Sequence, residues 1–234
     1  MTYFAGQFTT RRKEDNSPVT EADIAANTLI TRGLLQMAPH IPVIAEEDPL
    51  APLQGYSATS DAPFWLVDPL DGTRSFVRGE AEFTVNIGLI HNNAPVLGVI
   101  YAPPQKALYW GAAGQGAFKA IDAEKPSAIA VRSPSPDGLV VTRSRSHPSA
   151  QTNEYMARFN VLETRSGSSS IKFCEIAEGS ADLYPRFGRT MEWDTAAGHA
   201  ILNAAGGRVE TVDGQELRYG KPGYENPAFV AFGG

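Results

Sequence analysis

The chain has few cysteines and no excess of positive charge. Its 234 residues include one cysteine, Cys174, so an intrachain disulfide framework is excluded. A single cysteine suits a reducing compartment, and we predict a cytoplasmic protein. Lys and Arg number 20 against 26 Asp and Glu, which gives a formal net charge of −6. Binding to a nucleic-acid polymer is disfavoured because it requires many basic groups to neutralise phosphates.

Long apolar runs are also missing. No segment approaches the roughly 20 apolar residues that a membrane-spanning helix needs, and the N-terminus has no signal-peptide pattern. We expect no transmembrane segment, while peripheral membrane association stays open. What the chain does contain is 42% hydrophobic residues, enough for the core of one large domain or two small subdomains.

The local patterns predict an α+β first half and an α/β second half. Thr20 and Asp23 have the spacing of a capping box, so a helix should begin there and end before Pro39. An apolar helix face is expected from Ile24, Ala25, Leu29, Leu34 and Leu35. An antiparallel sheet is then predicted from strands at 42–45, 64–67, 83–90, 95–101, 108–111 and 116–120.

A connector rich in proline and serine, residues 133–138, marks the predicted subdomain boundary. Residues 1–135 would form an N-terminal subdomain with most metal ligands. Residues 136–234 would form a C-terminal subdomain with the substrate-binding groups and the last metal ligand. Strands and helices alternate after the boundary, which is typical of an α/β arrangement. The strands are expected at 139–142, 161–164 and 182–184, and the helices at 150–159, 168–178 and 195–205.

Three acidic stretches suggest a metal centre. Asp68 and Asp71 lie three residues apart after the apolar run 64–67, on what we expect to be a tight turn. Glu46 follows another apolar stretch, and Asp194 follows Trp193 far downstream. Hard divalent cations such as Mg²⁺ prefer oxygen ligands and share their coordination with water and phosphate. The pattern therefore predicts a polynuclear Mg²⁺ site and metal-assisted phosphoester chemistry.

Each acidic stretch also has a structural alternative. Asp68 and Asp71 could cap a helix that begins at Gly72, and residues 46–48 could form a solvated loop. Asp194 and Asp23 could likewise act only as helix caps. If the helix after Gly72 forms, Gly72 and Thr73 would present backbone N–H groups to a substrate phosphate.

The order of these motifs resembles the inositol monophosphatase superfamily of Mg²⁺-dependent, lithium-sensitive phosphatases. The resemblance rests on Glu46-Glu47, Asp68-Pro69-Leu70-Asp71-Gly72-Thr73 and Trp193-Asp194-Thr195-Ala196-Ala197-Gly198. The stretches 15–20, 167–174 and 184–188 are most similar to the CysQ-type 3'(2'),5'-bisphosphate nucleotidase branch. The resemblance implies a layered αβαβα sandwich. Since only residues 1–12 precede Lys13, we expect the N-terminal helix of the family to be shortened here.

The resemblance also implies roles for the metal-site residues. Asp68 would bridge two metal ions, Asp71 and Asp194 would ligate the second, and the carbonyl of Leu70 would contribute to the first. Two or three Mg²⁺ ions and inhibition by lithium are expected. Glu46 would be both a metal ligand and a catalytic residue that positions the attacking water.

Further catalytic and substrate-binding residues follow from the same resemblance. Thr73 would share water activation with Glu46, and Asp23 would contact the site through a metal-bound water. Basic and polar groups would surround a nucleoside and its 5'-phosphate, and charge-assisted hydrogen bonds suit this role. The expected substrate-binding residues are Gly72, Thr73, His147, Ser169, Lys172, Arg186 and Asp194.

These features predict a 3'(2'),5'-bisphosphate nucleotidase. A metal-activated water would attack phosphorus directly, converting adenosine 3',5'-bisphosphate to AMP and phosphate, and 3'-phosphoadenylyl sulfate is a further candidate substrate. Such an enzyme would serve sulfur assimilation as a monomer or homodimer with a small-molecule substrate. The alternatives are an inositol monophosphatase or fructose-1,6-bisphosphatase, and a catalytically idle metal- or nucleotide-binding protein.

Overall fold

A computed structural model describes residues 10–12, 18–48, 61–122 and 124–234. The expected shortening of the N-terminal helix concerns residues 1–12, of which 1–9 lie outside the described residues. Residues 10–12 form strand β1 (Thr10–Arg12), which pairs with β2 (Pro18–Thr20). Within the described ranges, no helix is long and apolar enough to cross a membrane.

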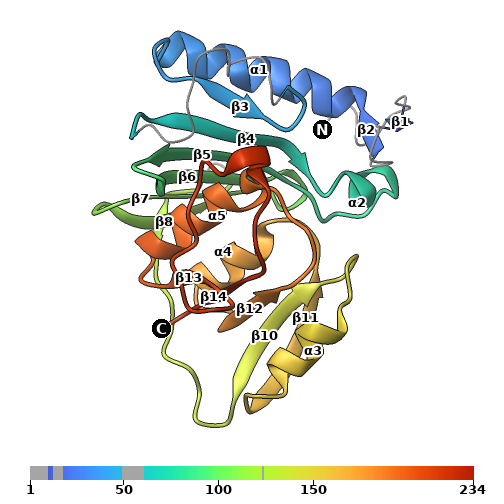
Figure 1. The fold of residues 1–234 in the computed structure, drawn as a ribbon, viewed down its shortest axis with the longest axis vertical. Coiled ribbons are helices and arrows are strands. Elements are labelled where there is room, and N and C mark those ends of the chain that lie inside the picture. Colours follow the sequence, from blue (N-terminus) through green and yellow to red (C-terminus); the bar gives the residue numbers. More distant parts are fainter. Residues whose placement is uncertain (1–9, 13–17, 49–60, 123) are drawn as a thin grey trace.

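Helices and sheets alternate in layers through the molecule (Figure 1). Helix α1 (Glu21–Met37) covers the outer face of a seven-stranded sheet, and α5 (Glu192–Ala204) covers its inner face. Helix α4 (Ile171–Ala177) lies beside α5, and both contact a five-stranded sheet. Helix α3 (Ala150–Met156) packs on the far side of that second sheet. The predicted αβαβα sandwich is therefore confirmed.

The first sheet has the order β3-β4-β5-β6-β7-β8-β9 and is antiparallel except for the parallel pair β3 and β4. The prediction of a wholly antiparallel sheet was wrong at this pair, and the exception matters for the site. Parallel strands bring their carboxyl ends to the same edge. The strands are β3 (Val43–Ala45), β4 (Phe64–Asp71), β5 (Thr84–His91), β6 (Ala94–Ala102), β7 (Ala107–Ala112), β8 (Gly116–Ile121) and β9 (Ser127–Ile129).

The second sheet is mixed and has the order β11-β10-β12-β14-β13. Strands β10, β11 and β12 are parallel, and the last two strands join in antiparallel fashion. Its strands are β10 (Leu139–Ser144), β11 (Val161–Gly167), β12 (Leu183–Arg186), β13 (Arg208–Thr211) and β14 (Phe229–Phe232). Sequence patterns did not predict β9, β13 or β14. The division into subdomains at residue 135 stays a prediction.

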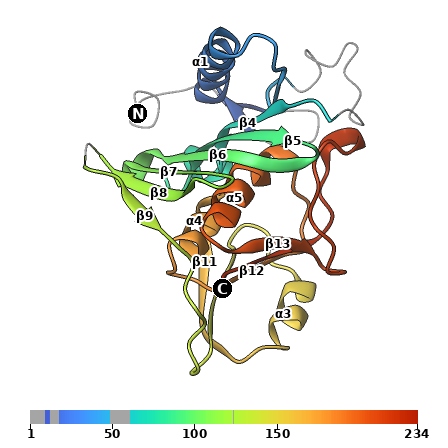
Figure 2. The same cartoon turned by 90° about the vertical axis from the view of Figure 1, so that its left-hand side faces the viewer.

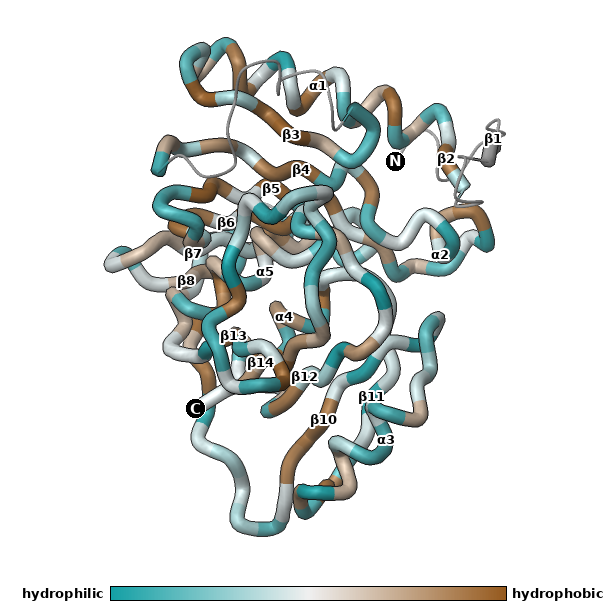
Figure 3. Tube along the Cα trace, in the orientation of Figure 1, coloured by the Kyte–Doolittle hydropathy of each residue, from teal (hydrophilic) through white to brown (hydrophobic). Residues whose placement is uncertain are grey.

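Three glycines allow helix α5 to approach the first sheet closely. Gly88, Gly98 and Gly111 lie on the adjacent strands β5, β6 and β7, and α5 packs against the same face of these strands (Figure 2). A Cβ atom on Gly98 would lie 2.2 Å from the carbonyl oxygen of Ala197. Because backbone leaves no room for a side chain there, α5 rests directly on the sheet. Figure 3 shows the most apolar segments along inner strands such as β3, β4 and β10, with hydrophilic segments on the outer loops.

The predicted apolar face of α1 is not the face that packs on the sheet. Leu34 is buried, but Leu29 is 74% exposed, and Ile24 and Leu35 are also exposed. The buried stripe instead includes Asp23, which accepts hydrogen bonds from Thr20 and from the distant Thr73. These polar contacts fix the rotation of the helix, so the hydrophobic pattern alone assigned the wrong face.

Substitution of Gly98 by alanine should test the close approach of α5. We expect Gly98→Ala to lower the free energy of unfolding by about 1–3 kcal/mol, because the new methyl group overpacks a rigid contact. The control is Gly33→Ala on α1, where no atom lies within 4 Å of an added Cβ. That change should stabilise the protein by roughly 0.5–1 kcal/mol through helix propensity. Urea denaturation measures both, and equal effects would contradict the packing argument.

Candidate functional site

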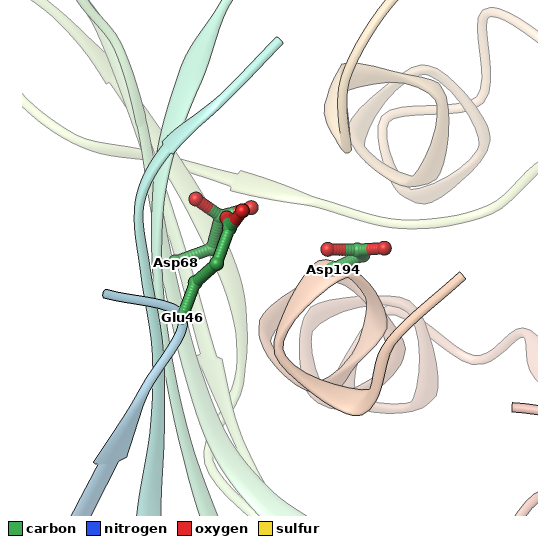
Figure 4. A group of neighbouring side chains, drawn as sticks. All are labelled: Glu46, Asp68 and Asp194. Atoms are coloured by element: carbon green, nitrogen blue, oxygen red, sulfur yellow. The ribbon is translucent and has the colours of Figure 1, made fainter. Parts of the chain in front are cut away.

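Three carboxylates from separate segments meet at one edge of the first sheet. Glu46 follows β3, Asp68 lies in β4, and Asp194 lies in the first turn of α5. One oxygen atom from each lies within 4.8 Å of the others. Figure 4 shows Glu46 and Asp68 together on the sheet side, with Asp194 facing them from the helix. The parallel pairing of β3 and β4 explains why the first two meet.

Desolvation and mutual repulsion act on these acids. The pKa of Asp68 is raised well above its ordinary value, first by burial and then by the charges of Glu46, Asp71 and Asp194. The pKa of Asp194 is raised well above its ordinary value by the same kinds of cause, desolvation being the largest. A cation between the carboxylates would remove this repulsion. The set is made only of oxygen donors, which fits Mg²⁺ and related hard cations.

Asp68 and Asp71 do not lie on a tight turn, as the sequence had suggested. Strand β4 continues to Asp71 because that residue still pairs with Thr84 of β5, with a register shift after Asp68. The backbone N–H of Leu70 donates to Asp68 Oδ1 at 2.9 Å. Gly72, with a φ of 99°, then turns the chain into the short helix α2 (Thr73–Val77). A shift in a strand, rather than a turn, therefore orients the two acids.

Asp71 lies outside the group of three carboxylates. Its pKa is raised by desolvation, and the positive charge of Lys172 opposes this shift. The side chain of Asn86 and the backbone of Ser170 also oppose the rise of this pKa. The structure thus brings together three of the predicted side-chain ligands, while Asp71 occupies a neighbouring position.

Asp23 and Thr73 join the N-terminus of α1 to the end of β4. Asp23 forms the predicted capping box, accepting from the backbone N–H of Thr20 at 2.8 Å. Thr73 Oγ1 lies 3.2 Å from Asp23 Oδ1 and 3.1 Å from the carbonyl oxygen of Leu70. The pKa of Asp23 is raised by burial, and Glu46 contributes to the shift. Asp23 is therefore a helix cap and also a partner of Thr73.

The cap interpretation of Asp194 is also resolved by the helix boundary. Helix α5 begins at Glu192, three residues earlier than predicted, and its N-cap is Met191. Asp194 Oδ2 accepts from the Met191 backbone N–H at 2.8 Å, and the carboxylate lines the pocket described next. Asp194 therefore stabilises the helix start and also faces the acidic group.

A pocket of about 700 Å³ contains almost the whole predicted site. Among the predicted residues only Asp23 is absent from its lining, and Asp23 contacts the lining residue Thr73. The volume suits a small organic ligand. The predicted residues that line it are Glu46, Asp68, Leu70, Asp71, Gly72, Thr73, His147, Ser169, Lys172, Arg186 and Asp194.

The pocket also has basic groups. Lys172 is buried, which lowers its pKa to about 8, although Asp71 partly opposes the shift. Its Nζ donates to the carbonyl of Ser169. The pKa of His147 is lowered, chiefly by partial desolvation and then by the charge of Arg186. Arg186 ends β12, is buried, and donates through Nη2 to the carbonyl of Arg189 at 3.0 Å.

Two polar atoms of this region have no hydrogen-bond partner in the part of the chain that the structure describes. They are the buried Oγ of Ser169 and the buried Nε of Arg186. Ser169 has a φ of 55°, so it ends the turn before α4. The helix predicted from residue 168 therefore starts only at Ile171. Buried polar atoms without partners are costly, and a polar ligand in the pocket would supply them.

Sequence reasoning did not identify several polar residues behind the acids. Thr84 and Asn86 on β5 are both buried and bond to Ser170. A signal was present, because both occupy the face of β5 that also carries Gly88 and Ile90. Polar residues on the buried face of an otherwise apolar strand usually have specific partners.

Comparisons with known proteins agree with the sequence motifs. The model of the inositol monophosphatase family matches residues 1–229. The 3'(2'),5'-bisphosphate nucleotidase CysQ of Salmonella typhimurium is 48% identical over 221 residues, which are 93% of this chain and 86% of that protein. The protein of the same name from Escherichia coli K12 is 46% identical over 219 residues, with the same coverage.

Solved structures agree as well. The crystal structure of CysQ from Bacteroides thetaiotaomicron, a bacterial member of the inositol monophosphatase family, has a TM-score of 0.81. It is 39% identical and the match covers 94% of this chain and 86% of that chain. An inositol monophosphatase from Thermotoga maritima has a TM-score of 0.77 at 25% identity, with coverage of 96% and 82%.

The acidic group should make the metal-free protein lose stability as pH rises. Asp68 and Asp194 have folded-state pKa values above the ordinary 3.8, so the folded protein retains protons that the unfolded chain releases. The free energy of unfolding should therefore fall as pH rises from about 4 through the raised pKa values. Asp68→Asn should make this fall smaller, and added Mg²⁺ should restore stability at neutral pH in the wild type but not in Asp68→Asn.

Urea denaturation in a chelator, at about pH 5 and about pH 8, measures this effect. Asp213→Asn, a change of an exposed acid, is the matched control. An unchanged pH slope in Asp68→Asn would contradict the proposed repulsion.

Proposed function

The chain belongs to the inositol monophosphatase family, and on that premise we propose that it is a Mg²⁺-dependent 3'(2'),5'-bisphosphate nucleotidase. It removes the 3'-phosphate of adenosine 3',5'-bisphosphate and produces AMP and phosphate; 3'-phosphoadenylyl sulfate is a second candidate substrate. One observation carries the choice of substrate. A single pocket combines an acidic group with the buried cations of Lys172 and Arg186, as a substrate with two separated phosphates requires.

The cation ligands of this proposal are Glu46, Asp68, Asp71 and Asp194, together with the carbonyl of Leu70. They would hold two or three Mg²⁺ ions, and inhibition by lithium is expected as a family property. The bound cations would supply Lewis-acid chemistry, lowering the pKa of water and stabilising charge on the phosphoryl oxygens. The all-oxygen donor set and the raised pKa values of Asp68 and Asp194 support this assignment.

Glu46 and Thr73 are proposed to orient the attacking water. Thr73 has one hydroxyl proton and can donate it to Asp23 Oδ1, 3.2 Å away. Its oxygen is then free to accept a hydrogen bond from the water, and Glu46 accepts from the same molecule. Asp23 thereby sets the direction of the Thr73 hydroxyl. The attack is direct and in line with the leaving 3'-oxygen, so no covalent enzyme intermediate is required.

The basic residues are proposed to hold the second phosphate and the nucleoside. Lys172 and Arg186 supply positive charge in a desolvated setting, where charge-assisted hydrogen bonds are strong. His147 and Ser169 lie nearby on separate loops. The partnerless Oγ of Ser169 and Nε of Arg186 are donors that a phosphate or ribose could satisfy. Gly72, Thr73 and Asp194 would contact the 3'-phosphate group beside the cations.

The rival activities use the same acidic group but different substrates. Inositol monophosphate has one phosphate and does not require the buried cations of Lys172 and Arg186. An idle binding protein would retain affinity without turnover. A cytoplasmic location, supported by the single cysteine, and a monomeric or homodimeric state remain part of the proposal.

A substrate comparison tests the proposed function. With Mg²⁺, phosphate release should be fastest by kcat/KM from adenosine 3',5'-bisphosphate, with inositol 1-phosphate and fructose 1,6-bisphosphate far behind. Lys172→Met should raise KM for the nucleotide by roughly 10- to 100-fold, the scale of a lost buried charged contact, and should affect inositol 1-phosphate much less. Equal losses on both substrates would contradict a role of Lys172 in choosing the nucleotide.

The affinity for the nucleotide should also depend on pH through the charge of Lys172. The pKa of Lys172 is lowered to about 8, so its positive charge is lost as pH rises through that value. The affinity for the nucleotide should therefore decline above about pH 8 in the wild type. In Lys172→Arg the charge persists, and the decline should disappear.

Glu46→Gln separates an enzyme from a binding protein. If Glu46 orients the water, kcat should fall by about two to four orders of magnitude while nucleotide affinity changes by less than about fivefold. Asp48→Asn, in the same loop but exposed, should retain normal kcat. Phosphate release and calorimetry measure the two quantities. A wild type that binds the nucleotide but never releases phosphate would instead support the idle-protein alternative.

A further inference from the structure

A chain of buried hydrogen bonds leads from strand β5 to Asp71. Thr84 Oγ1 and Ser170 Oγ lie 2.8 Å apart, and Ser170 Oγ donates to Asn86 Oδ1 at 2.6 Å. Asn86 Nδ2 lies 3.4 Å from Asp71 Oδ2. Thr84, Asn86 and Ser170 are each 1–2% exposed. None of these three residues was identified from the sequence.

The number of protons on each group determines which group donates in each of these hydrogen bonds. Ser170 has a single hydroxyl proton, which is used on Asn86 Oδ1, so Thr84 must be the donor to Ser170. Because the amide oxygen of Asn86 is engaged by Ser170, its NH₂ group is turned toward Asp71. All side-chain donors of this series therefore point toward the carboxylate. This arrangement stabilises Asp71 as an anion, the form that can ligate a cation.

This series of hydrogen bonds joins two parts of the protein that are distant in the sequence. Asp71, Thr84 and Asn86 belong to the first sheet, whereas Ser170 belongs to the turn between β11 and α4. Ser168, in the same turn, also bonds to the first half of the sequence. Its Oγ accepts from Ser75 Oγ at 3.1 Å, and its backbone N–H donates to Glu82 at 3.1 Å. The same turn contains Ser169, whose carbonyl accepts from Lys172.

We propose that Asn86 and Ser170 are positioning residues that hold Asp71 in place as a cation ligand and tie it to the turn that faces the nucleotide. This inference rests on the proposed function, because it requires Asp71 to bind a cation. Outer residues that orient a ligating carboxylate typically account for a 10- to 100-fold difference in metal affinity. The pair thus makes cation affinity depend on a residue of the nucleotide-binding turn.

Mn²⁺ titration followed by electron paramagnetic resonance tests the proposal without nucleotide or turnover. Ser170→Ala removes the hydroxyl but retains the backbone N–H. We expect its Mn²⁺ dissociation constant to rise by about 10- to 100-fold. The control Ser180→Ala also removes a donor hydroxyl, which has the Glu175 carbonyl and the Glu178 carboxylate as acceptors, and Ser180 does not line the pocket. It should bind Mn²⁺ as the wild type does.

Further variants separate positioning from simple stability. Asn86→Ala breaks the same link from the other side and should weaken Mn²⁺ similarly, which provides the test if Ser170→Ala does not fold. Thr84→Val removes only the first donor, so Ser170 still bonds to Asn86 and the loss should stay below about threefold. Melting temperatures identify any general loss of stability, which by itself would not move the Mn²⁺ dissociation constant.

The outcomes distinguish this inference from the proposed function. Wild-type Mn²⁺ affinity in folded Ser170→Ala and Asn86→Ala would overturn the positioning role, even if the wild type hydrolyses the nucleotide. A loss of Mn²⁺ affinity in Thr84→Val equal to that in Ser170→Ala would contradict the proposed donor direction, from Thr84 through Ser170 and Asn86 to Asp71. A wild type that binds no Mn²⁺ and releases no phosphate would instead refute the proposed function itself.

Discussion

The repulsion between buried carboxylates is the constraint on which the rest of this structure depends. Glu46, Asp68 and Asp194 bring negative charge into a partly desolvated pocket, which raises the pKa of both Asp68 and Asp194. Their desolvation and mutual repulsion oppose that arrangement in the absence of a cation. The fold imposes it through the parallel pairing of β3 with β4 and the seating of α5 on the sheet.

Helix α5 connects the packed core with the acidic group of the pocket. Its close approach to the glycines of β5, β6 and β7 requires small residues such as Ala196 and Ala197 on the facing side. The same packing sets where its first turn lies, and Asp194 occupies that turn with its carboxylate bonded to the Met191 backbone. The positive end of the helix dipole favours an acid at this position. A tightly packed core contact thereby positions a ligand of the proposed metal centre.

The local motifs predicted much of the site because their chemistry is short-range. The capping box of Thr20 and Asp23 formed as expected, and the acids at 46, 68 and 194 came together. The predictions failed where distant partners decided the outcome. Asp71 pairs with β5 instead of ending a turn, and the left-handed Ser169 delays the start of α4. Hydrophobic periodicity assigned the wrong face of α1, since the polar contacts of Asp23 control its rotation.

The sequence by itself determined the family, the alternating layers and the acids that meet in the pocket, because motif spacing and hydrophobic pattern are properties of the linear chain. Only the tertiary structure decided which acids share one cation-sized space and which polar groups stand behind them. The sequence pattern did not show that Thr84, Asn86 and Ser170 are partners of one another. Their role arises when the first sheet meets a turn more than eighty residues away along the chain, where burial leaves each polar atom to find its partner within the protein.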